Sequence, residues 1–254
     1  MLFWKKKNRG EGNKEYNKDI EALLNRIYPE DNGFEEKEMS RIEQALEVRF
    51  PEALRNYCLK YGKCAINYTN NCLLIPEEVQ TLYRNLEEEY QDDPEDFEDT
   101  YGMTLEEMKN KTGDHLIFYR ENQGVWQAGI RWDELSQENP KVYYDNAGID
   151  NWTFMSNSVR SFLLSMLWEN IRWSGLDFEH YANDTAQIEK VASKNGIELD
   201  KLMDSSLDNK FCRTCFDKDT GKLFFFLANR ENKLVELIIV TSDLIRALDG
   251  KASD

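Results

Sequence analysis

The sequence predicts an α+β fold, in which an antiparallel sheet packs against helices and a C-terminal α-β-β-β-α extension follows. Three extended runs lie between residues 114 and 144, separated by a Glu-Asn-Gln-Gly turn and by Asn139-Pro140. The hydrophobic period then changes from strand-like to helical over residues 158–173. The apolar positions of this helix are Val159, Phe162, Leu163, Met166, Leu167 and Ile171. Because the helix is apolar nearly all round, we expect it to be buried across one face of the sheet.

The chain before this sheet is expected to be mostly helical. Residues 1–18 hold six Lys or Arg and two Glu, and we interpret them as a basic, solvated N-terminal tail. Helices are predicted over 16–27, over 39–46 and from Pro51 to Gly62, where proline and glycine mark a beginning and an end. A hairpin-like segment between Cys64 and Cys72 and a buried strand at 72–75 should follow. A further helix is predicted from Pro76 through Tyr90. Thr104 and Glu107 predict a capping box for a short helix.

Residues 87–107 form an acidic block without Lys or Arg. Its carboxylates are Glu87, Glu88, Glu89, Asp92, Asp93, Glu95, Asp96, Glu98, Asp99, Glu106 and Glu107. The block could be a solvated loop or a docking surface for a cationic partner, with Phe97 and Tyr101 as aromatic anchors. We favour docking, because solubility requires charge but not clustering. The predicted partner-binding residues are Asp92, Asp93, Glu95, Asp96, Phe97, Glu98, Asp99, Tyr101 and Trp126.

Trp126 joins this set because of its position in the second extended run. It alternates with Val125, so one of the two side chains should be exposed. An exposed tryptophan near an acidic segment is a candidate hot spot for protein binding. The competing interpretation is that Trp126, like Trp132, Trp152, Trp168 and Trp173, belongs to the core.

Residues 176–254 are expected to form the extension, packed on the domain at 19–175. A helix is predicted around 186–192, ending near Gly196, and is followed by extended runs at 211–216, 223–228 and 234–240. Ser242 should cap a last helix. The absence of a long linker predicts that the extension packs on the first domain or shares its sheet.

Composition narrows the classes of partner. The formal net charge is −16, which makes nucleic acid and anionic membranes poor partners and a basic protein a good one. The five cysteines are an odd number, and neither a signal peptide nor a membrane-spanning run is evident. We therefore expect a cytoplasmic protein with reduced thiols. The sequence does not define the oligomeric state.

No motif predicts catalysis, a metal or a cofactor. Cys212 and Cys215 have metal-like spacing, but a second cysteine pair is missing, and alternation in a strand would point the two to opposite faces. His115 and His180 are far apart in the sequence. Phosphate loops, nucleophile elbows and dinucleotide fingerprints are absent. The sequence therefore predicts a protein that is not an enzyme.

Packing and turn residues across about 35–173 resemble the SMI1/KNR4, or SUKH, superfamily. The matching residues are Ile42, Glu43, Leu46, Phe50, Pro51, Leu54, Tyr57, Tyr61 and Gly62, then Phe118, Tyr119, the segment 121–126, Gly129, Ile130, Pro140, Val142, Tyr143, Trp152 and the segment 161–164. Ala128 departs from the pattern, because relatives often carry tryptophan before the glycine.

This resemblance implies a function. Many bacterial members are immunity proteins that neutralise toxins, often nucleases, by stoichiometric occlusion, and an acidic surface would suit a basic active site. A regulatory or scaffolding role, as in fungal relatives, is the alternative. A hydrolase or metal enzyme with an unrecognised site is the third hypothesis. A toxin gene beside this one would separate the first from the second, and metal content would test the third.

Overall fold

The structure is a computed structural model that describes residues 14–16, 20–28, 32–145, 150–202, 204–207, 210–229 and 231–251. Most of the predicted tail at 1–18 lies outside these residues. Within it, Lys14–Tyr16 form a strand, β1, that pairs with β10 (Lys210–Asp217) of the C-terminal part, so for these three residues the prediction of a solvated tail is wrong. The first predicted helix is correspondingly shorter, since α1 runs over Ile20–Ile27.

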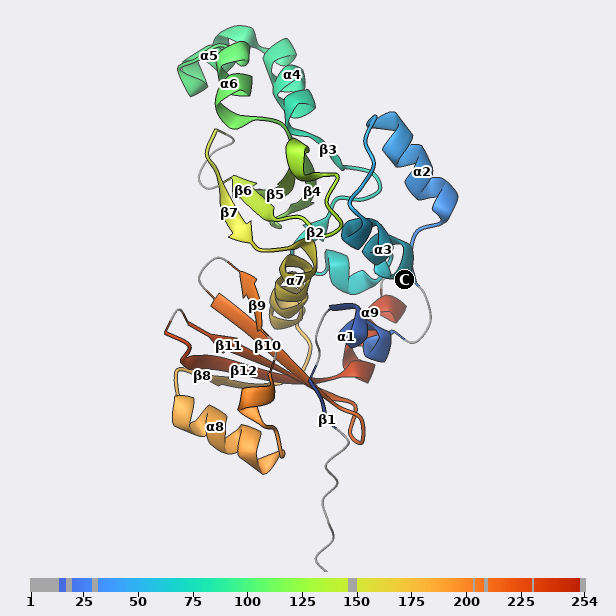
Figure 1. Cartoon of the computed structure of the whole chain (residues 1–254), viewed down its shortest axis with the longest axis vertical. Coiled ribbons are helices and arrows are strands. Elements are labelled where there is room, and N and C mark those ends of the chain that lie inside the picture. The colour runs from blue at the N-terminus through green and yellow to red at the C-terminus, as the bar shows by residue number, and fades with distance from the viewer. Residues whose placement is uncertain are drawn as a thin grey trace, which may run out of the picture.

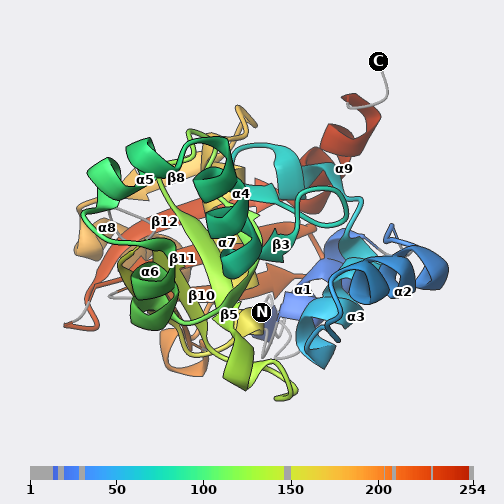
Figure 2. The ribbon, with the colours of Figure 1, turned by 90° about the horizontal axis from the view of Figure 1, so that it is seen from above.

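The first unit combines α1, α2 (Glu36–Ala45) and α3 (Glu52–Tyr61) with a sheet (Figure 1). The three helices lie together on one side of the molecule (Figure 2). Pro51 precedes the first turn of α3 and Gly62 follows its last, as predicted. Between Cys64 and Cys72 the chain forms a 3-10 helix, Ala65–Tyr68, rather than a hairpin-like segment. The sheet strands are β2 (Cys72–Leu73), β3 (Gln80–Thr81), β4 (His115–Arg120), β5 (Gln127–Arg131), β6 (Val142–Asp145) and β7 (Trp152–Ser156).

The helix predicted from Pro76 begins later than expected, at Leu82. Residues 75–78 form a turn, and β3 pairs with β4 before the helix α4 (Leu82–Asp92) begins. Thr81 is the N-cap, and its hydroxyl accepts a hydrogen bond from the backbone N–H of Arg84 at 3.2 Å. The backbone of residues 80–81 is thus used by the sheet and cannot continue a helix from Pro76.

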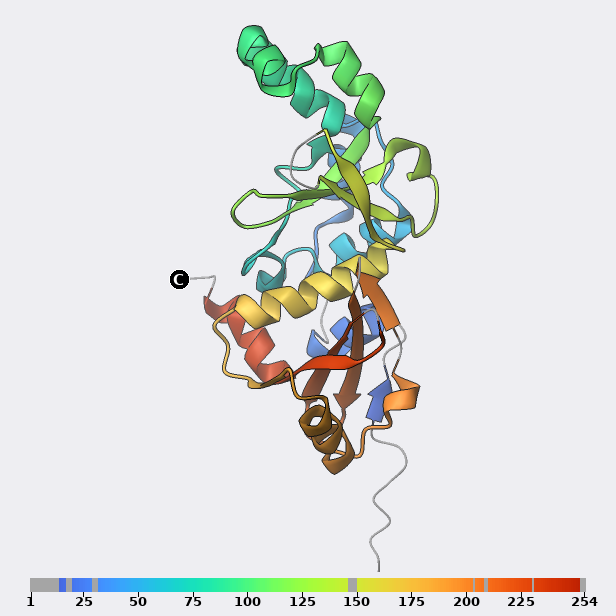
Figure 3. The same cartoon turned by 90° about the vertical axis from the view of Figure 1, so that its left-hand side faces the viewer.

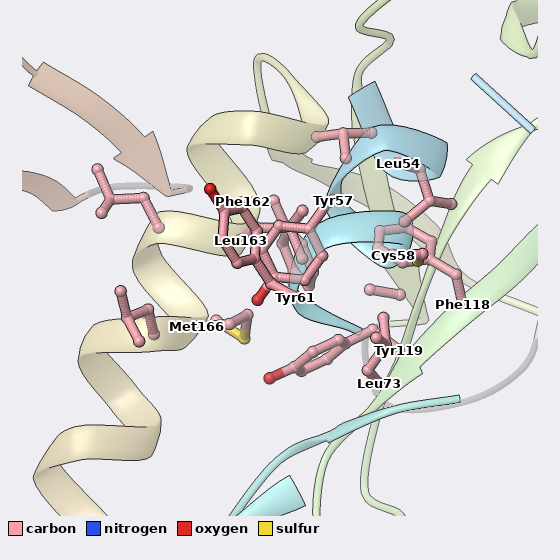
Figure 4. Packing of buried hydrophobic residues seen from close by; sticks show 14 of the residues in the cluster. Leu54, Tyr57, Cys58, Tyr61, Leu73, Phe118, Tyr119, Phe162, Leu163 and Met166 are labelled. Atoms are coloured by element: carbon pink, nitrogen blue, oxygen red, sulfur yellow. The ribbon is translucent and has the colours of Figure 1, made fainter. Parts of the chain in front are cut away.

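The helix predicted over 158–173 is α7 (Val159–Trp173), capped by Ser158. It lies between the first sheet and the C-terminal strands (Figure 1). Its residues Phe162, Leu163 and Met166 face the helix α3 and the strand β4, which supply Tyr57, Tyr61 and Tyr119 (Figure 4). Leu163 is 2 % exposed and Phe162 is fully buried. The apolar circumference of this helix follows the sequence prediction, and Ser158 is the cap of the two serines, Ser156 and Ser158, that the sequence offered.

The C-terminal unit contains the predicted helix α8 (Thr185–Lys194), the strands β10, β11 (Lys222–Ala228) and β12 (Leu234–Thr241), and the helix α9 (Ser242–Lys251). Two further strands, β8 (Glu179–Ala182) and β9 (Asp204–Leu207), pair with β12 and β10. Thus the predicted α-β-β-β-α order is present, with strands added at both edges.

The two units share a sheet path and a core. Ser156 of β7 pairs with Leu207 of β9, and α1 packs against α9. Cys212 of β10 belongs to the large core that includes α7, whereas Cys215 belongs to a smaller core beneath α8. The extension therefore both packs on the first unit and continues its sheet.

Candidate partner-binding surface

Residues 82–112 form three helices, which we call the acidic arm. They are α4, α5 (Pro94–Tyr101) and α6 (Leu105–Thr112), and they project at the end of the molecule opposite the C-terminal sheet (Figure 1). The acidic block is thus helical almost throughout. The helix predicted through Tyr90 and the short helix predicted after the Thr104–Glu107 capping box are present, and the loop interpretation is wrong for the residues of α5 between them. From above, the arm is the nearest part of the molecule (Figure 2).

Local signals explain why this acidic sequence is helical. Asp93 caps α5, with its carboxylate accepting from the N–H of Asp96 at 3.1 Å, and Pro94 occupies the first turn. Thr104 and Glu107 form a capping box at α6. Gly102 ends α5 at a φ of 65°, in the left-handed region that glycine tolerates. The hydrogen bond from the backbone N–H of Thr104 is the main reason that the pKa of Glu107 is lowered.

The aromatic residues of the arm hold it together. Phe97 is only 2 % exposed, and its ring lies 5.4 Å from that of Tyr90 and 4.8 Å from that of Tyr101. Phe97 is therefore a core residue, so its predicted role as an exposed anchor is wrong. Tyr101 is half-buried and donates a hydrogen bond to Glu89 at 2.9 Å. Burial and this hydrogen bond raise the pKa of Tyr101.

The carboxylates of the acidic block fall into two groups. Glu87 pairs with Lys109 and Glu88 with Arg84, Glu89 accepts a hydrogen bond from Tyr101, and Asp93 and Glu107 serve as caps. The others are exposed, and the described structure gives them no ion pair: Asp92, Glu95, Asp96, Glu98, Asp99 and Glu106. Four of these, Glu95, Asp96, Glu98 and Asp99, lie on α5, and we call them the α5 quartet. Their mutual repulsion is unrelieved within the described chain, so a cationic partner would relieve it.

The arm is attached firmly to the first sheet. The backbone N–H of Tyr83 donates to the carboxylate of Asp114 at 3.0 Å, and the Tyr83 hydroxyl donates to the carbonyl of Lys109 at 2.9 Å. Lys111 forms an ion pair of 2.6 Å with Asp150, just before β7. Because both ends of the arm are held by packed structure, little further ordering is needed for binding.

Trp126 lies elsewhere, beside the turn between β4 and β5. Its ring stacks against Tyr119 and meets Tyr144 edge-on, with both centroids at 6.4 Å, so it is half-buried. The exposed residue of the alternating pair is Val125, at 66 %. Trp126 lines a cavity of about 430 Å³ together with Trp173, which is 61 % exposed. The sequence prediction grouped Trp173 with core residues, which is wrong. The one signal of its exposure in the sequence is its position at the last residue of the long helix α7.

The two histidines lie on strands β4 and β8, near opposite ends of the same sheet. His115 is buried and stacks on Trp152 with ring centroids 4.2 Å apart, and burial lowers its pKa to about 4. His180 contacts Glu236 at 2.6 Å, and Arg172 lies 3.5 Å from the same carboxylate oxygen. Each histidine therefore contributes to packing or to a contact between elements.

Chemistry that needs clustered ligands is not assembled in the described part of the chain. Among those residues, no group of three or more His, Cys, Asp or Glu could hold a metal ion. Cys212 and Cys215 are buried on opposite faces of β10, as strand alternation predicts. No helix within the described ranges is long and apolar enough to cross a membrane.

Comparison with known proteins gives one match. A family model described as the SMI1 / KNR4 family (SUKH-1) matches residues 33–165, just over half of the chain. The matched region includes the first sheet, the acidic arm and the beginning of α7. It confirms the resemblance seen in the packing and turn residues. No curated protein and no solved structure matches the chain.

Proposed function

Because the chain belongs to the SMI1/KNR4 family (SUKH-1), we propose that it is an immunity protein that binds and neutralises a cognate bacterial toxin. The family is generally one of toxin immunity, which suggests a protein as the partner. Binding rather than catalysis would account for the activity, with one chain covering the active site of one toxin molecule.

The observation that carries this proposal is the α5 quartet. It presents four exposed carboxylates without ion pairs among the described residues, on a helix held from behind by the buried Phe97. A rigid, unrelieved negative surface attracts a basic protein over several ångströms and can raise association rates toward roughly 10⁸–10⁹ M⁻¹s⁻¹ at low salt. Single exposed pairs are each worth about 0–1 kcal/mol, so the effect must come from the whole group.

Such a surface suits a nuclease toxin in particular. An enzyme that binds phosphates carries Lys and Arg in its active site. Carboxylates on the arm would occupy the positions of the phosphates and exclude the substrate. Because electrostatic contact of this kind is screened by salt, inhibition should weaken as ionic strength rises.

The first experiment identifies the partner. The tagged chain is used for capture from the native cell, and the captured protein is then co-expressed with the chain and with a variant in which the α5 quartet is changed to Gln or Asn. We expect the parent chain to rescue growth and the variant to rescue it less. Capture of a regulatory protein that harms no cell would instead support the scaffolding alternative.

A matched control is available at the other end of the molecule. The control quartet consists of Asp177, Glu189, Asp200 and Glu231, which are exposed and have no ion pair among the described residues. Changing these four to Asn or Gln alters the net charge by the same amount. Rescue that falls equally for both quartets would show that total charge, not the arm, is what matters.

A further inference from the structure

A cavity of about 430 Å³ lies between the β4–β5 turn, the segment at 70–71 and α7. Tryptophans and acidic or amide side chains line it: Trp126, Trp173, Glu121, Glu169, Asn70 and Asn122. Met155 and Met166, which are almost fully buried, supply apolar surface. None of the described residues that line it is Lys or Arg. The cavity therefore combines flat aromatic surface with hydrogen-bond acceptors and negative charge.

The turn side of the cavity is built rigidly. The Glu121 carboxylate accepts from the N–H groups of Gln123 and Val125 at 2.8 and 3.2 Å, and its charge remains beside the cavity. The Asn122 amide donates to the side-chain oxygen of Asn70 at 2.8 Å, which joins the turn to the segment at 70–71. Gly124 supplies the positive φ of 71° that this turn needs. This wall is thus formed before any ligand arrives.

The helix side presents an exposed tryptophan. Trp173 donates its indole N–H to Glu169 at 3.2 Å, so its one polar group is already bonded while 61 % of the side chain stays exposed. The guanidinium of Arg172 lies 5.2 Å from the ring centroid of Trp173 and is itself paired with Glu236. The Trp173 ring thus already receives one guanidinium, and the Arg172 charge is balanced by a carboxylate outside the cavity.

These features fit a planar cation on an apolar stem. A guanidinium stacks on tryptophan, donates up to five hydrogen bonds and matches carboxylate and amide oxygens. An ammonium group lacks the flat shape that two indole rings favour. We propose that the cavity receives an arginine side chain of the partner protein. The inference rests on the proposed function only in taking the partner to be a protein.

The position of the cavity agrees with this role. In Figure 3 the β4–β5 turn and the C-terminal end of α7 lie on the same side of the molecule as α5. A partner drawn in by the arm would therefore meet the cavity on the same face. The α5 quartet would act mainly on the association rate, because its charge attracts the partner at long range. The filled cavity would act mainly on the dissociation rate.

The test uses a free guanidinium as the probe. L-argininamide is titrated into the ¹⁵N-labelled full chain, and the indole N–H signals are followed, with Trp173→Phe to assign one of them. We expect a saturable shift of the Trp126 and Trp173 signals. The amide of citrulline, whose side chain has the same length and no charge, should give at least tenfold weaker binding. Glu169→Gln should weaken argininamide binding about fivefold or more, and Glu189→Gln, on the exposed face of α8, should leave it unchanged.

Two results would overturn the proposal. One is the absence of a saturable shift, or equal binding of argininamide and of the citrulline amide with its uncharged side chain. The other is a Trp173→Ala variant that folds and dissociates from the captured partner as slowly as the parent, whereas we expect dissociation about tenfold faster or more. The second result would contradict only the proposal that the cavity receives an arginine, and it would leave the proposed immunity function untouched. If argininamide binds but no protein is captured, the occupant is not the side chain of a partner protein. The cavity would then be a binding site for a small molecule that carries a guanidinium.

Discussion

The amide of Asn170 on α7 donates a hydrogen bond to the hydroxyl of Tyr119 on β4, at 3.2 Å, inside the core. The same amide donates to the carbonyls of Ile66 and Asn71 at 2.7 and 3.1 Å, and its oxygen accepts from the Asn71 N–H at 2.9 Å. One buried side chain thus ties the central helix to the sheet and to the segment that forms one wall of the cavity.

Removing this amide should be costly. Asn170→Ala leaves the carbonyls of Ile66 and Asn71 and the Asn71 N–H without this partner, and each such loss costs about 1–3 kcal/mol. We expect a loss of about 3–4 kcal/mol in the free energy of unfolding, measured by urea denaturation. Tyr119→Phe removes one hydroxyl and should cost only about 1 kcal/mol. Equal costs for the two variants would contradict the central role given to Asn170.

The apolar circumference of α7 gives a second prediction. Leu163 is 2 % exposed, so Leu163→Ala should destabilise by about 2–5 kcal/mol through lost burial and a cavity. Leu163→Asp should prevent folding, because a buried, unpaired charge costs several kcal/mol. Leu244→Asp is the control, since Leu244 of α9 is 37 % exposed. Circular dichroism and thermal melting measure all three, and unchanged melting of Leu163→Asp would show that α7 is misplaced.

His115 predicts how stability depends on pH. Its folded pKa of about 4 lies below the ordinary value of 6.5, so the unfolded chain takes up the proton first as pH falls. The stabilisation is complete above pH 6.5 and is lost as pH falls toward 4. Between pH 7 and 4.5 the loss should be about 2–3 kcal/mol. The buried Asp145, whose pKa is raised to about 6, acts in the opposite direction, since protonation below pH 6 favours its folded state.

Comparison with His115→Phe isolates this effect. The variant keeps a flat ring against Trp152 but cannot titrate, and Asp145 contributes equally to both proteins. Urea midpoints at pH 7 and pH 4.5 should show the parent losing about 2–3 kcal/mol more than the variant on acidification. The same pH dependence in both proteins would mean that His115 is not kept neutral by burial.

Phe97 determines whether the acidic arm stays folded. Phe97→Ala removes the ring that Tyr90 and Tyr101 contact, and it should destabilise the arm locally by about 3–5 kcal/mol. Amide hydrogen exchange should increase across α5 and little in α7. Thr100→Ala, at an exposed position of α5, is the control. Unchanged exchange in α5 would show that the arm does not depend on this small aromatic core.

The predictable parts of the fold are those with long, continuous apolar runs. Helix α7 and the strands β11 and β12 are apolar over long runs, so their type and extent are clear from the sequence. Strand β8 was missed because it is an exposed edge strand without an apolar face. The strand β7 was missed because its exposed and buried residues do not alternate.

The candidate site could be predicted only in part. The acidic block is visible in the sequence, but its helices depend on the caps Asp93 and Thr104 and on a single buried phenylalanine. The high charge of residues 94–101 hid the helical period of α5. The cavity joins residues from position 70 to position 173, and neighbours so distant in sequence become visible only when the chain is folded.

The account is tested most directly by the association rate of the captured partner as a function of salt, for the parent, the α5-quartet variant and the control-quartet variant. We predict that the α5-quartet variant associates about tenfold more slowly at low salt, with a much flatter salt dependence, while the control quartet changes the rate far less. Circular dichroism verifies that both variants are folded. An α5-quartet variant that associates as fast as the parent, with the same salt dependence, would contradict the claim that the arm binds the partner.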